Sequence, residues 1–188
     1  MSVLVHICCA PCLIGPLAVL RAEGAELAGY FYNPNIHPFL EFRKRVKAVR
    51  VFQQKDALPI EIDEEYGLDR FVREVYDADR THRCENCHLL RLRATARKAV
   101  ERGFEAFTTT LLGSPHQDHE MVRAAGQRAA EEAGVRFLYH DFRPQHEKGH
   151  EEARKRGIYL QQYCGCCFSE YERYRDTTRE LYRGGASL

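Results

Sequence analysis

Short segments rich in β-branched residues alternate with segments of helical periodicity along this chain, and that alternation constrains its fold more than any other feature. Residues 3–7 are short and mainly apolar, as expected of a buried central strand. Leu13, Leu17 and Leu20 recur at helical spacing within residues 13–22, and Gly24 follows. Strands that alternate with helices predict a mainly parallel sheet covered on both faces. We therefore expect an α/β fold, a three-layer sandwich.

The same pattern extends over the rest of the chain. Further strands are expected at residues 26–32, 59–62, 106–110 and 136–139, and further helices at 38–53, 68–76, 89–101, 117–132, 148–156 and 169–183. A length of 188 residues suffices to bury a core, so we expect one domain, residues 1–188, with residues 159–188 as a cysteine-bearing C-terminal segment. No apolar stretch approaches the ~20 residues of a membrane span and the first residues lack a secretory pattern, which favours a cytoplasmic protein.

Eight cysteines carry most of the chemical information in the sequence. They fall into three groups, Cys8-Cys9-x-x-Cys12, Cys84-x-x-Cys87 and Cys164-Gly165-Cys166-Cys167. In a reducing compartment, closely spaced thiols bind metal or carry out redox chemistry more often than they form structural disulfides. Thiolates are soft ligands, which favour an iron–sulfur cluster, zinc or copper(I) over magnesium or calcium.

The first group lies between the expected first strand and the expected first helix. A helix N-terminus lowers the pKa of a nearby thiol and so favours the thiolate. A nucleotide-binding protein of similar architecture would carry a glycine-rich loop at this position. Residues 8–12 stand there instead, which argues against an ATP- or NAD-dependent enzyme, including a nucleotide-dependent tRNA thiolase or ligase.

The second group has the spacing of a metal-binding hook. Cys84 and Cys87 are compatible with a zinc half-site, a thioredoxin-like redox pair or half of an iron–sulfur ligand set. Together with Cys8 and Cys9 they provide four thiolates, which suit a four-cysteine cluster or a structural zinc. The spacing leaves the metal open, but a chain with a core of its own does not need zinc to fold, which favours a functional cluster.

The third group places one glycine between two cysteines. Gly165 permits the tight backbone that would bring Cys164 and Cys166 together, and a disulfide between them would be strained and easily reduced. Such a bond suits an electron relay. The alternative is that these cysteines supply further metal ligands.

Polar and basic residues elsewhere provide further candidates. His37, Asp118, Asp141 and Arg143 follow expected strands, at the same edge of the sheet as Cys8, and are candidate acid–base groups, metal ligands or phosphate contacts. Capping and turn roles are the alternative for each of them. Basic runs at residues 43–50 and 91–102 would contact a phosphate backbone or would form ordinary solvated helix faces.

Six motifs occur in one order along the chain. They are His6-Ile7-Cys8-Cys9-Ala10-Pro11-Cys12, Tyr32-Asn33-Pro34-Asn35-Ile36-His37-Pro38, Arg83-Cys84-x-x-Cys87, Thr109-Thr110-Leu111-Leu112, Asp141-Phe142-Arg143 and Tyr163-Cys164-Gly165-Cys166. In this order, over about residues 3–174, the chain resembles the epoxyqueuosine reductase QueH family. The resemblance implies a fold like that of the adenine nucleotide α-hydrolases (HUP type). It also implies cobalamin-independent reduction of epoxyqueuosine to queuosine at the wobble position of tRNA, the final step of queuosine biosynthesis.

The resemblance further implies the residues of the site. Cys8, Cys9, Cys84 and Cys87 match the ligands of a [4Fe–4S] cluster, and Cys164 and Cys166 match a redox-active pair. A separate mononuclear iron is implied beside the cluster, with its ligands drawn from Cys12, Asp118, Asp141 and Cys166. His37 or Asp141 would protonate the oxygen that leaves the epoxide.

The implied partner is tRNA that carries epoxyqueuosine, together with an electron donor. The sequence identifies neither that donor nor the oligomeric state. Cys167 stands where the family pattern has a hydrophobic residue, so which of Cys164, Cys166 and Cys167 form a pair stays open. The competing hypothesis is a zinc-stabilised tRNA-binding module without catalysis, which would not need Cys164 and Cys166.

Overall fold

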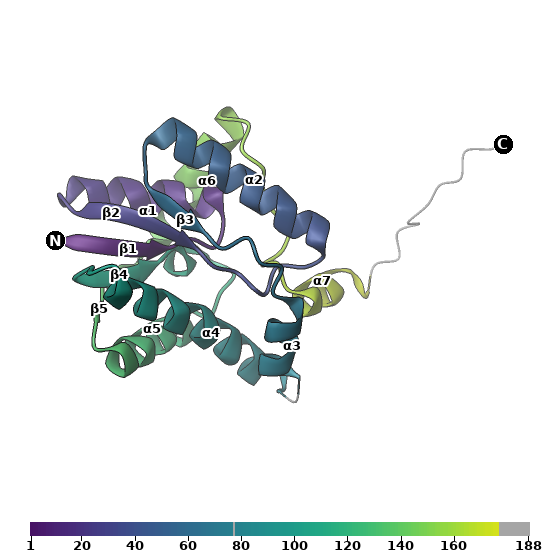
Figure 1. The fold of residues 1–188 in the computed structure, drawn as a ribbon. Coiled ribbons are helices and arrows are strands. Elements are labelled where there is room, and N and C mark those ends of the chain that lie inside the picture. The colour runs from purple at the N-terminus through teal and green to yellow at the C-terminus, as the bar shows by residue number, and fades with distance from the viewer. Residues whose placement is uncertain (77, 177–188) are drawn as a thin grey trace.

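The first strand, β1 (Ser2–His6), lies at the centre of the sheet in the computed structural model, which describes residues 1–76 and 78–176 (Figure 1). Val3, Leu4 and Val5 are almost completely buried, because β1 has a hydrogen-bonded strand on each side and helices over both faces. A strand buried on both faces needs apolar residues at successive positions, as this segment has.

Five parallel strands form one sheet in the described part of the chain, in the order β3-β2-β1-β4-β5. The other four are β2 (Glu26–Phe31), β3 (Ile60–Ile62), β4 (Ala106–Thr109) and β5 (Arg136–Phe137). The strands after β1 add on one side as far as β3 and then on the other side from β4. A sheet of this order changes its winding direction between β1 and β4 and has a crevice beyond their carboxyl ends.

Helices cover the sheet on both faces (Figure 1). On one face lie α1 (Ala10–Ala22), α2 (Phe39–Asp56) and α6 (His146–Lys155), and on the other lie α4 (Arg80–Glu101) and α5 (His119–Ala133). The short helices α3 (Leu68–Val75) and α7 (Cys167–Tyr174) lie beyond the carboxyl ends of the strands, and two 3₁₀ turns are η1 (Thr110–Gly113) and η2 (Arg143–Gln145). The expected three-layer α/β sandwich with a mainly parallel sheet is confirmed.

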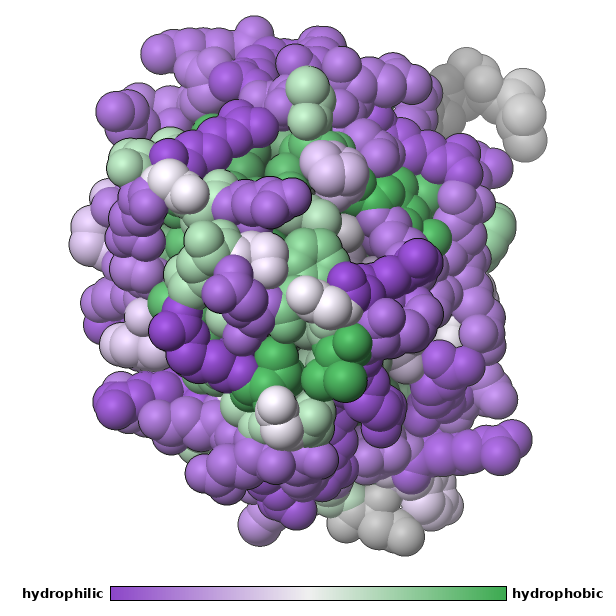
Figure 2. All heavy atoms as spheres, turned by 60° about the vertical axis from the view of Figure 1, so that its left-hand side comes forward, coloured by the Kyte–Doolittle hydropathy of each residue, from purple (hydrophilic) through white to green (hydrophobic). Residues whose placement is uncertain are grey.

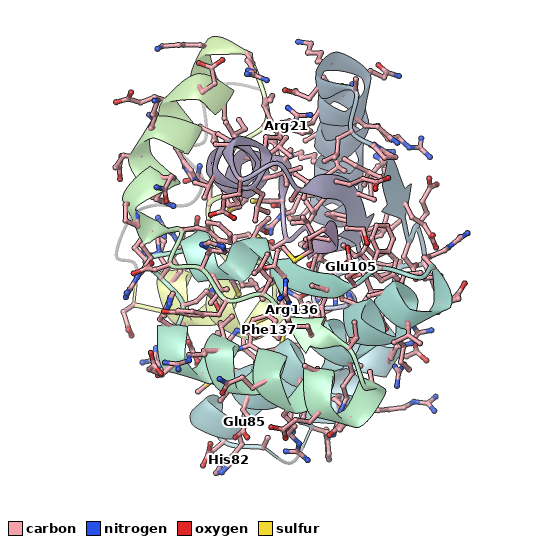
Figure 3. The ribbon with its side chains drawn as sticks, turned by 90° about the vertical axis from the view of Figure 1, so that its left-hand side faces the viewer. Arg21, His82, Glu85, Glu105, Arg136 and Phe137 are labelled. Atoms are coloured by element: carbon pink, nitrogen blue, oxygen red, sulfur yellow. The ribbon has the colours of Figure 1, made fainter. Side chains whose placement is uncertain are left out.

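Each face of the sheet has its own apolar core. Phe31 and Phe52 belong to the core beneath α1 and α2, whereas Leu92 and Phe107 belong to the core beneath α4 and α5. Helix α5 packs very closely against Phe137 of β5, which Figure 3 labels. A Cβ at Gly126 of α5 would come within 2.3 Å of the Phe137 ring. Glycine therefore allows α5 to approach the short edge strand β5.

Most expected elements occur within a few residues of their predicted bounds, and α4 is the main exception. The helix expected at residues 89–101 is present, but its predicted start is wrong, because α4 begins at Arg80. The carboxylate of Asp79 accepts a hydrogen bond from the backbone N–H of His82 at 3.0 Å and caps this earlier start. Figure 3 labels His82 and Glu85 at this end of the helix. Cys84 and Cys87 therefore lie three residues apart on the first turns of a helix, where such residues share one face.

Two other bounds differ from expectation. The strand expected at 136–139 ends at Phe137, and the helix expected at 169–183 corresponds to α7, with residues 177–183 outside the described residues. The side of the molecule that carries the amino ends of the strands is turned forward in Figure 2, where hydrophilic residues surround a smaller hydrophobic area. Among the described residues, no helix has the length and apolar character needed to cross a membrane.

Candidate metal and redox site

Cys8 and Thr110 lie just beyond the carboxyl ends of β1 and β4, the strands between which the winding direction changes. The backbone N–H of Cys8 donates a hydrogen bond to the Thr110 hydroxyl at 3.0 Å, and that hydroxyl donates to the Cys8 sulfur at 3.1 Å. Ligand sites of open α/β sheets form at this point. Two adjacent strands therefore fix the position of the first cysteine group.

The sulfurs of Cys8, Cys9 and Cys12 come together at this point. Those of Cys8 and Cys9 are 3.9 Å apart, and all three lie within 4.8 Å of one another. Cys9 also caps α1, since its sulfur accepts a hydrogen bond from the backbone N–H of Cys12 at 3.3 Å. Within residues 1–76 and 78–176, no other three His, Cys, Asp or Glu side chains gather so closely. We name Cys8, Cys9 and Cys12 the cysteine trio; three soft donors at this spacing suit iron or zinc.

The three thiols of the trio differ in pKa. Hydrogen bonds with Cys12 and Cys9, and a further one from Thr110, hold the pKa of Cys8 well below its usual range. Burial raises the pKa of Cys9, and hydrogen bonding to Cys8 raises the pKa of Cys12. The trio therefore favours the thiolate at Cys8 over a thiolate at Cys9 or Cys12.

Gln161 contacts the trio from a distant part of the sequence. Its amide Nε2 donates a hydrogen bond to the Cys9 sulfur at 2.9 Å and lies 3.6 Å from the Cys12 sulfur. Its Oε1 is buried and has no hydrogen-bond partner among the described residues. Hydrogen bonds to cysteine sulfurs tune the properties of a bound metal centre. Gln161 was not predicted from the sequence, because no cysteine or histidine spacing signals a glutamine that contacts a ligand sulfur.

A cavity of about 900 Å³ opens beside the trio, and members of all three cysteine groups line it. Its cysteines are Cys12, Cys84, Cys87, Cys164 and Cys166. Its wall also carries aromatic and polar side chains, which include Phe71, Tyr163, Phe168, His88, Gln117 and Asp118. This volume lies in the usual range for small-molecule sites. The cavity therefore unites cysteines that the sequence places far apart.

Cys87 is buried in the cavity wall next to Arg91. Arg91 is only 4% exposed, and its Nε donates to the backbone carbonyl of Cys87 at 3.1 Å. Burial raises the pKa of the Cys87 thiol to about 11, and the charge of Arg91 opposes that shift. Arg91 begins the second basic run, but it faces the interior, where it favours a thiolate at Cys87.

Cys164, Gly165 and Cys166 form a tight loop, which we name the Cys164–Cys166 loop. Gly165 has a φ of +121°, a conformation that favours glycine. The Cys166 sulfur caps α7 by accepting a hydrogen bond from the backbone N–H of Ser169 at 3.3 Å. The hydrogen bond from Cys166 lowers the pKa of Cys164 to about 5 and raises that of Cys166. A thiolate thus lies beside a thiol, as a reactive dithiol requires.

Of the three other candidates, Asp118 alone lines the cavity, within the described residues, and it also caps α5. His37 is buried, and its ring lies 5.1 Å from that of Phe71. The carboxylate of Asp141 accepts hydrogen bonds from Arg143 at 2.6 and 2.8 Å. The structure therefore brings Asp118 together with the cysteines and leaves His37 and Asp141 outside the cavity lining.

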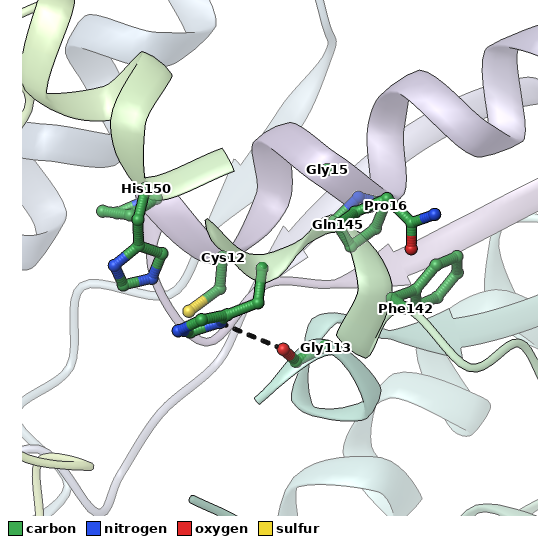
Figure 4. A pocket seen from close by; sticks show the side chains of 9 residues that line it. Cys12, Gly15, Pro16, Gly113, Phe142, Gln145 and His150 are labelled. Atoms are coloured by element: carbon green, nitrogen blue, oxygen red, sulfur yellow. Dashed lines mark hydrogen bonds between the residues drawn. The ribbon is translucent and has the colours of Figure 1, made fainter. Parts of the chain in front are cut away.

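Two histidines that were not among the sequence candidates, His146 and His150, line a small pocket together with Cys12, and Figure 4 labels His150 and Cys12 there. His146 and His150 share one face of α6, with ring centroids 4.2 Å apart. Nδ1 of His146 lies 3.1 Å from the carbonyl oxygen of Gly113, and both histidines also line the large cavity. Their spacing of four residues was the available signal, but the helix expected at 148–156 began after His146.

The chain is similar to known proteins over nearly its whole length. The sequence pattern of the family described as epoxyqueuosine reductase QueH matches residues 3–172. The chain belongs to the QueH family. Proteins named epoxyqueuosine reductase QueH include one from Dehalococcoides mccartyi, 36% identical over 173 residues (92% of this chain, 94% of the relative). Another, from Thermotoga maritima, is 36% identical over 192 residues (97% of this chain, 96% of the relative). The resemblance inferred from the six motifs is confirmed.

Solved structures are similar at a much lower level. A deacetylase of teicoplanin biosynthesis has a TM-score of 0.48 at 14% identity and covers 80% of this chain and 83% of its own. A predicted subunit of a tRNA methyltransferase from Methanocaldococcus jannaschii has a TM-score of 0.47 at 11% identity, with coverages of 84% and 88%. Neither likeness bears on function, which rests on QueH membership and on the site.

Proposed function

We propose that this QueH-family chain is an oxidoreductase that reduces epoxyqueuosine to queuosine in tRNA without cobalamin. Family membership supports the activity. The structural observation that carries the proposal is that members of all three cysteine groups line one cavity of about 900 Å³. A metal centre, a dithiol and a modified base would then meet in one place.

Cys8, Cys9, Cys84 and Cys87 are the proposed ligands of a [4Fe–4S] cluster, and Cys12 and Asp118 are the proposed ligands of an additional mononuclear iron. Cys166, the other sequence candidate for that iron, is assigned to the dithiol instead. The donor chemistry fits an iron–sulfur centre, since the sulfurs of Cys8 and Cys9 lie 3.9 Å apart and accept hydrogen bonds from Thr110 and Gln161. When bound, such groups supply single-electron transfer and Lewis acidity toward an oxygen. Asp141 is left out of this set because its carboxylate already pairs with Arg143.

The proposed reaction balances through Cys164 and Cys166. Reduction of an epoxide to an alkene consumes two electrons and two protons and releases water. The Cys164 thiolate and the Cys166 thiol give up two electrons and one proton when they form a disulfide, and solvent supplies the second proton. The epoxide, the thiolate–thiol pair and one proton from solvent thus yield alkene, disulfide and water, and a separate electron donor restores the reduced pair before the next turnover. Because neither His37 nor Asp141 lines the cavity among the described residues, the Cys166 thiol is also the proposed source of one proton.

We further propose that residues 1–188 form one catalytic domain, which acts in the cytoplasm on tRNA carrying epoxyqueuosine. The segment from residue 159 onward belongs to the site in this proposal, because Gln161 contacts the trio and Cys164 and Cys166 line the cavity.

The test is mass spectrometry of nucleosides from tRNA that carries epoxyqueuosine, after incubation with anaerobically purified protein and a reductant. Conversion to queuosine over many turnovers is expected. No conversion by protein that retains its iron would contradict the assignment. Full multiple-turnover activity of Cys164→Ser and Cys166→Ser proteins would contradict the dithiol step alone.

A further inference from the structure

Arg45 lies in the middle of the basic run at residues 43–50, yet it is almost completely buried, with 2% of its surface exposed. Its neighbours Arg43, Lys44 and Lys47 are exposed on α2, as a solvated helix face requires. A buried guanidinium is costly unless each of its groups finds a partner. The partners of Arg45 therefore indicate what this residue does.

All three nitrogens of the Arg45 guanidinium donate hydrogen bonds. Nη1 donates to the backbone carbonyl of Cys164 at 2.9 Å, and Nη2 donates to the carbonyl of Tyr163, also at 2.9 Å. Nε donates to the Glu41 carboxylate at 2.7 Å, one turn earlier on α2. The planar fork of an arginine suits this arrangement, because it presents several donors in a fixed geometry. Arg45 thus connects a helix to the start of the Cys164–Cys166 loop.

Further contacts hold the same segment from both ends. The Tyr159 hydroxyl donates to the second oxygen of Glu41 at 2.5 Å, so Glu41 joins Arg45 to residue 159 as well. The backbone N–H of His37 donates to the carbonyl of Gly165 at 2.7 Å, and the Tyr163 hydroxyl donates to the carbonyl of His37. These bonds come from α2 and from the loop before it.

The loop passes close to the guanidinium that holds it. A Cβ at Gly165 would lie 3.2 Å from Nη1 of Arg45 and 3.0 Å from Cγ1 of Ile36. Glycine at this position therefore meets two requirements at once, the φ of +121° and the close approach of Arg45.

We propose that Arg45 is a positioning residue that holds Cys164 and Cys166 in the geometry in which their sulfurs pair. The inference rests on the proposed redox role of these two cysteines and assigns a function to a residue outside the motifs. A loop held at the carbonyls of Tyr163 and Cys164 keeps one thiol at high effective concentration near the other. Release of that hold disfavours the disulfide relative to the dithiol.

The test is the equilibrium between the loop and glutathione. Two thiols and one glutathione disulfide give one loop disulfide and two glutathione thiols, so atoms and electrons balance. The full-length, iron-loaded protein is equilibrated anaerobically in buffers of known glutathione ratio. Differential alkylation and mass spectrometry of the peptide that contains residues 164–167 then give the oxidised fraction.

The main variant is Arg45→Met with Glu41→Gln, which removes both buried charges together and keeps their volume. Loss of two hydrogen bonds to the loop is expected to lower the equilibrium constant for disulfide formation about tenfold or more. Arg45→Lys keeps the charge opposite Glu41 but lacks the fork, so an intermediate value is expected. If the double variant does not fold, the equilibrium constant of Arg45→Lys alone tests the positioning role.

Matched controls separate positioning from general loss of stability. Glu41→Gln alone leaves the donors of Arg45 to both carbonyls in place and is expected to keep most of the wild-type equilibrium. Arg156→Met removes an arginine that pairs with Asp56 and Glu152 and, within the described part of the chain, makes no hydrogen bond with the loop. It should leave the equilibrium constant for disulfide formation unchanged. A wild-type equilibrium constant in folded Arg45→Lys or in the folded double variant overturns the proposal. Because this measurement needs no tRNA, it can fail or succeed independently of the reductase assay.

Discussion

The side-chain nitrogen of Gln161 lies 2.9 Å from the sulfur of Cys9, although the two residues are 152 positions apart in the sequence. Three residues after Gln161 the chain reaches Cys164, whose carbonyl accepts a hydrogen bond from Arg45. One short segment therefore contacts the cysteine trio and carries the Cys164–Cys166 loop. This contact makes the C-terminal part of the chain a component of the site.

Gln161→Leu should weaken metal binding at the trio, because the substitution removes the donor to the Cys9 sulfur while it keeps a similar volume. Loss of such a supporting contact typically lowers metal affinity roughly 10- to 100-fold. The measurement is the rate and extent of iron release to a chelator under anaerobic conditions. The neighbouring Gln162→Leu is the control, because the Gln162 side chain is exposed and makes no hydrogen bond to a sulfur among the described residues. Equal release from both variants would contradict the role of Gln161.

Thr110→Val should destabilise the fold, whereas Thr108→Val should not. Both residues are completely buried, but the Thr110 hydroxyl bonds to the N–H and sulfur of Cys8, while the Thr108 hydroxyl has no hydrogen-bond partner among the described residues. An orphaned buried N–H at Cys8 costs about 1–3 kcal/mol in the free energy of unfolding. Denaturant unfolding of the two variants measures the difference. A neutral Thr110→Val would show that the Cys8 backbone finds another partner.

Asp141 should be ionised throughout the neutral pH range. The hydrogen bond from Arg143 lowers the pKa of Asp141 to about 2, from an ordinary value of 3.8. Since the folded-state pKa is the lower one, the pair stabilises the fold above pH 3.8, and that contribution is lost as the pH falls to about 2. NMR titration of the carboxyl checks the value, and Arg143→Gln should return the midpoint toward 3.8. If the midpoint of Asp141 stays at about 2 in Arg143→Gln, a group other than Arg143 lowers the pKa of Asp141.

Charge reversal at Arg154 and Arg173 should weaken tRNA binding, because both arginines are exposed and line the cavity that the modified base must enter. Each lost phosphate contact is expected to lower the salt-dependence slope by about 1. Binding of an anticodon stem-loop at several salt concentrations measures that slope. Arg128→Glu, near the end of α5, is the control, since Arg128 pairs with Glu132. If charge reversal at Arg154 and Arg173 leaves the slope unchanged, the cavity arginines do not contact the phosphates. Arg43, Lys44 and Lys47 on α2 would then be the candidates for tRNA binding.

Much of the fold could be predicted from the sequence, because the strands are short apolar runs and the helices have clear periodicity. The start of α4 could not, since residues 80–88 are polar and their helix depends on the Asp79 cap and on burial of Cys87. The end of the short strand β5 could not be predicted from periodicity either, because the strand ends where its pairing with β4 ends.

The cysteine groups could be predicted from spacing alone, whereas the residues that support them could not. Arg45 and Arg91 belong to basic runs typical of helix surfaces, and only tertiary packing turns their guanidinium groups inward toward a backbone carbonyl. The distinction between Asp118 and Asp141 likewise depends on the fold. Both follow strands in sequence, but within the described chain only Asp118 reaches the cavity.

The measurement that tests the central claim most directly is the content of iron and acid-labile sulfide per chain in anaerobically purified protein. The account predicts about four sulfides with four or five irons, and an excess of iron over sulfide would correspond to the additional metal. Zinc without sulfide, persisting after attempted anaerobic reconstitution, would contradict the account and favour a zinc-stabilised tRNA-binding module.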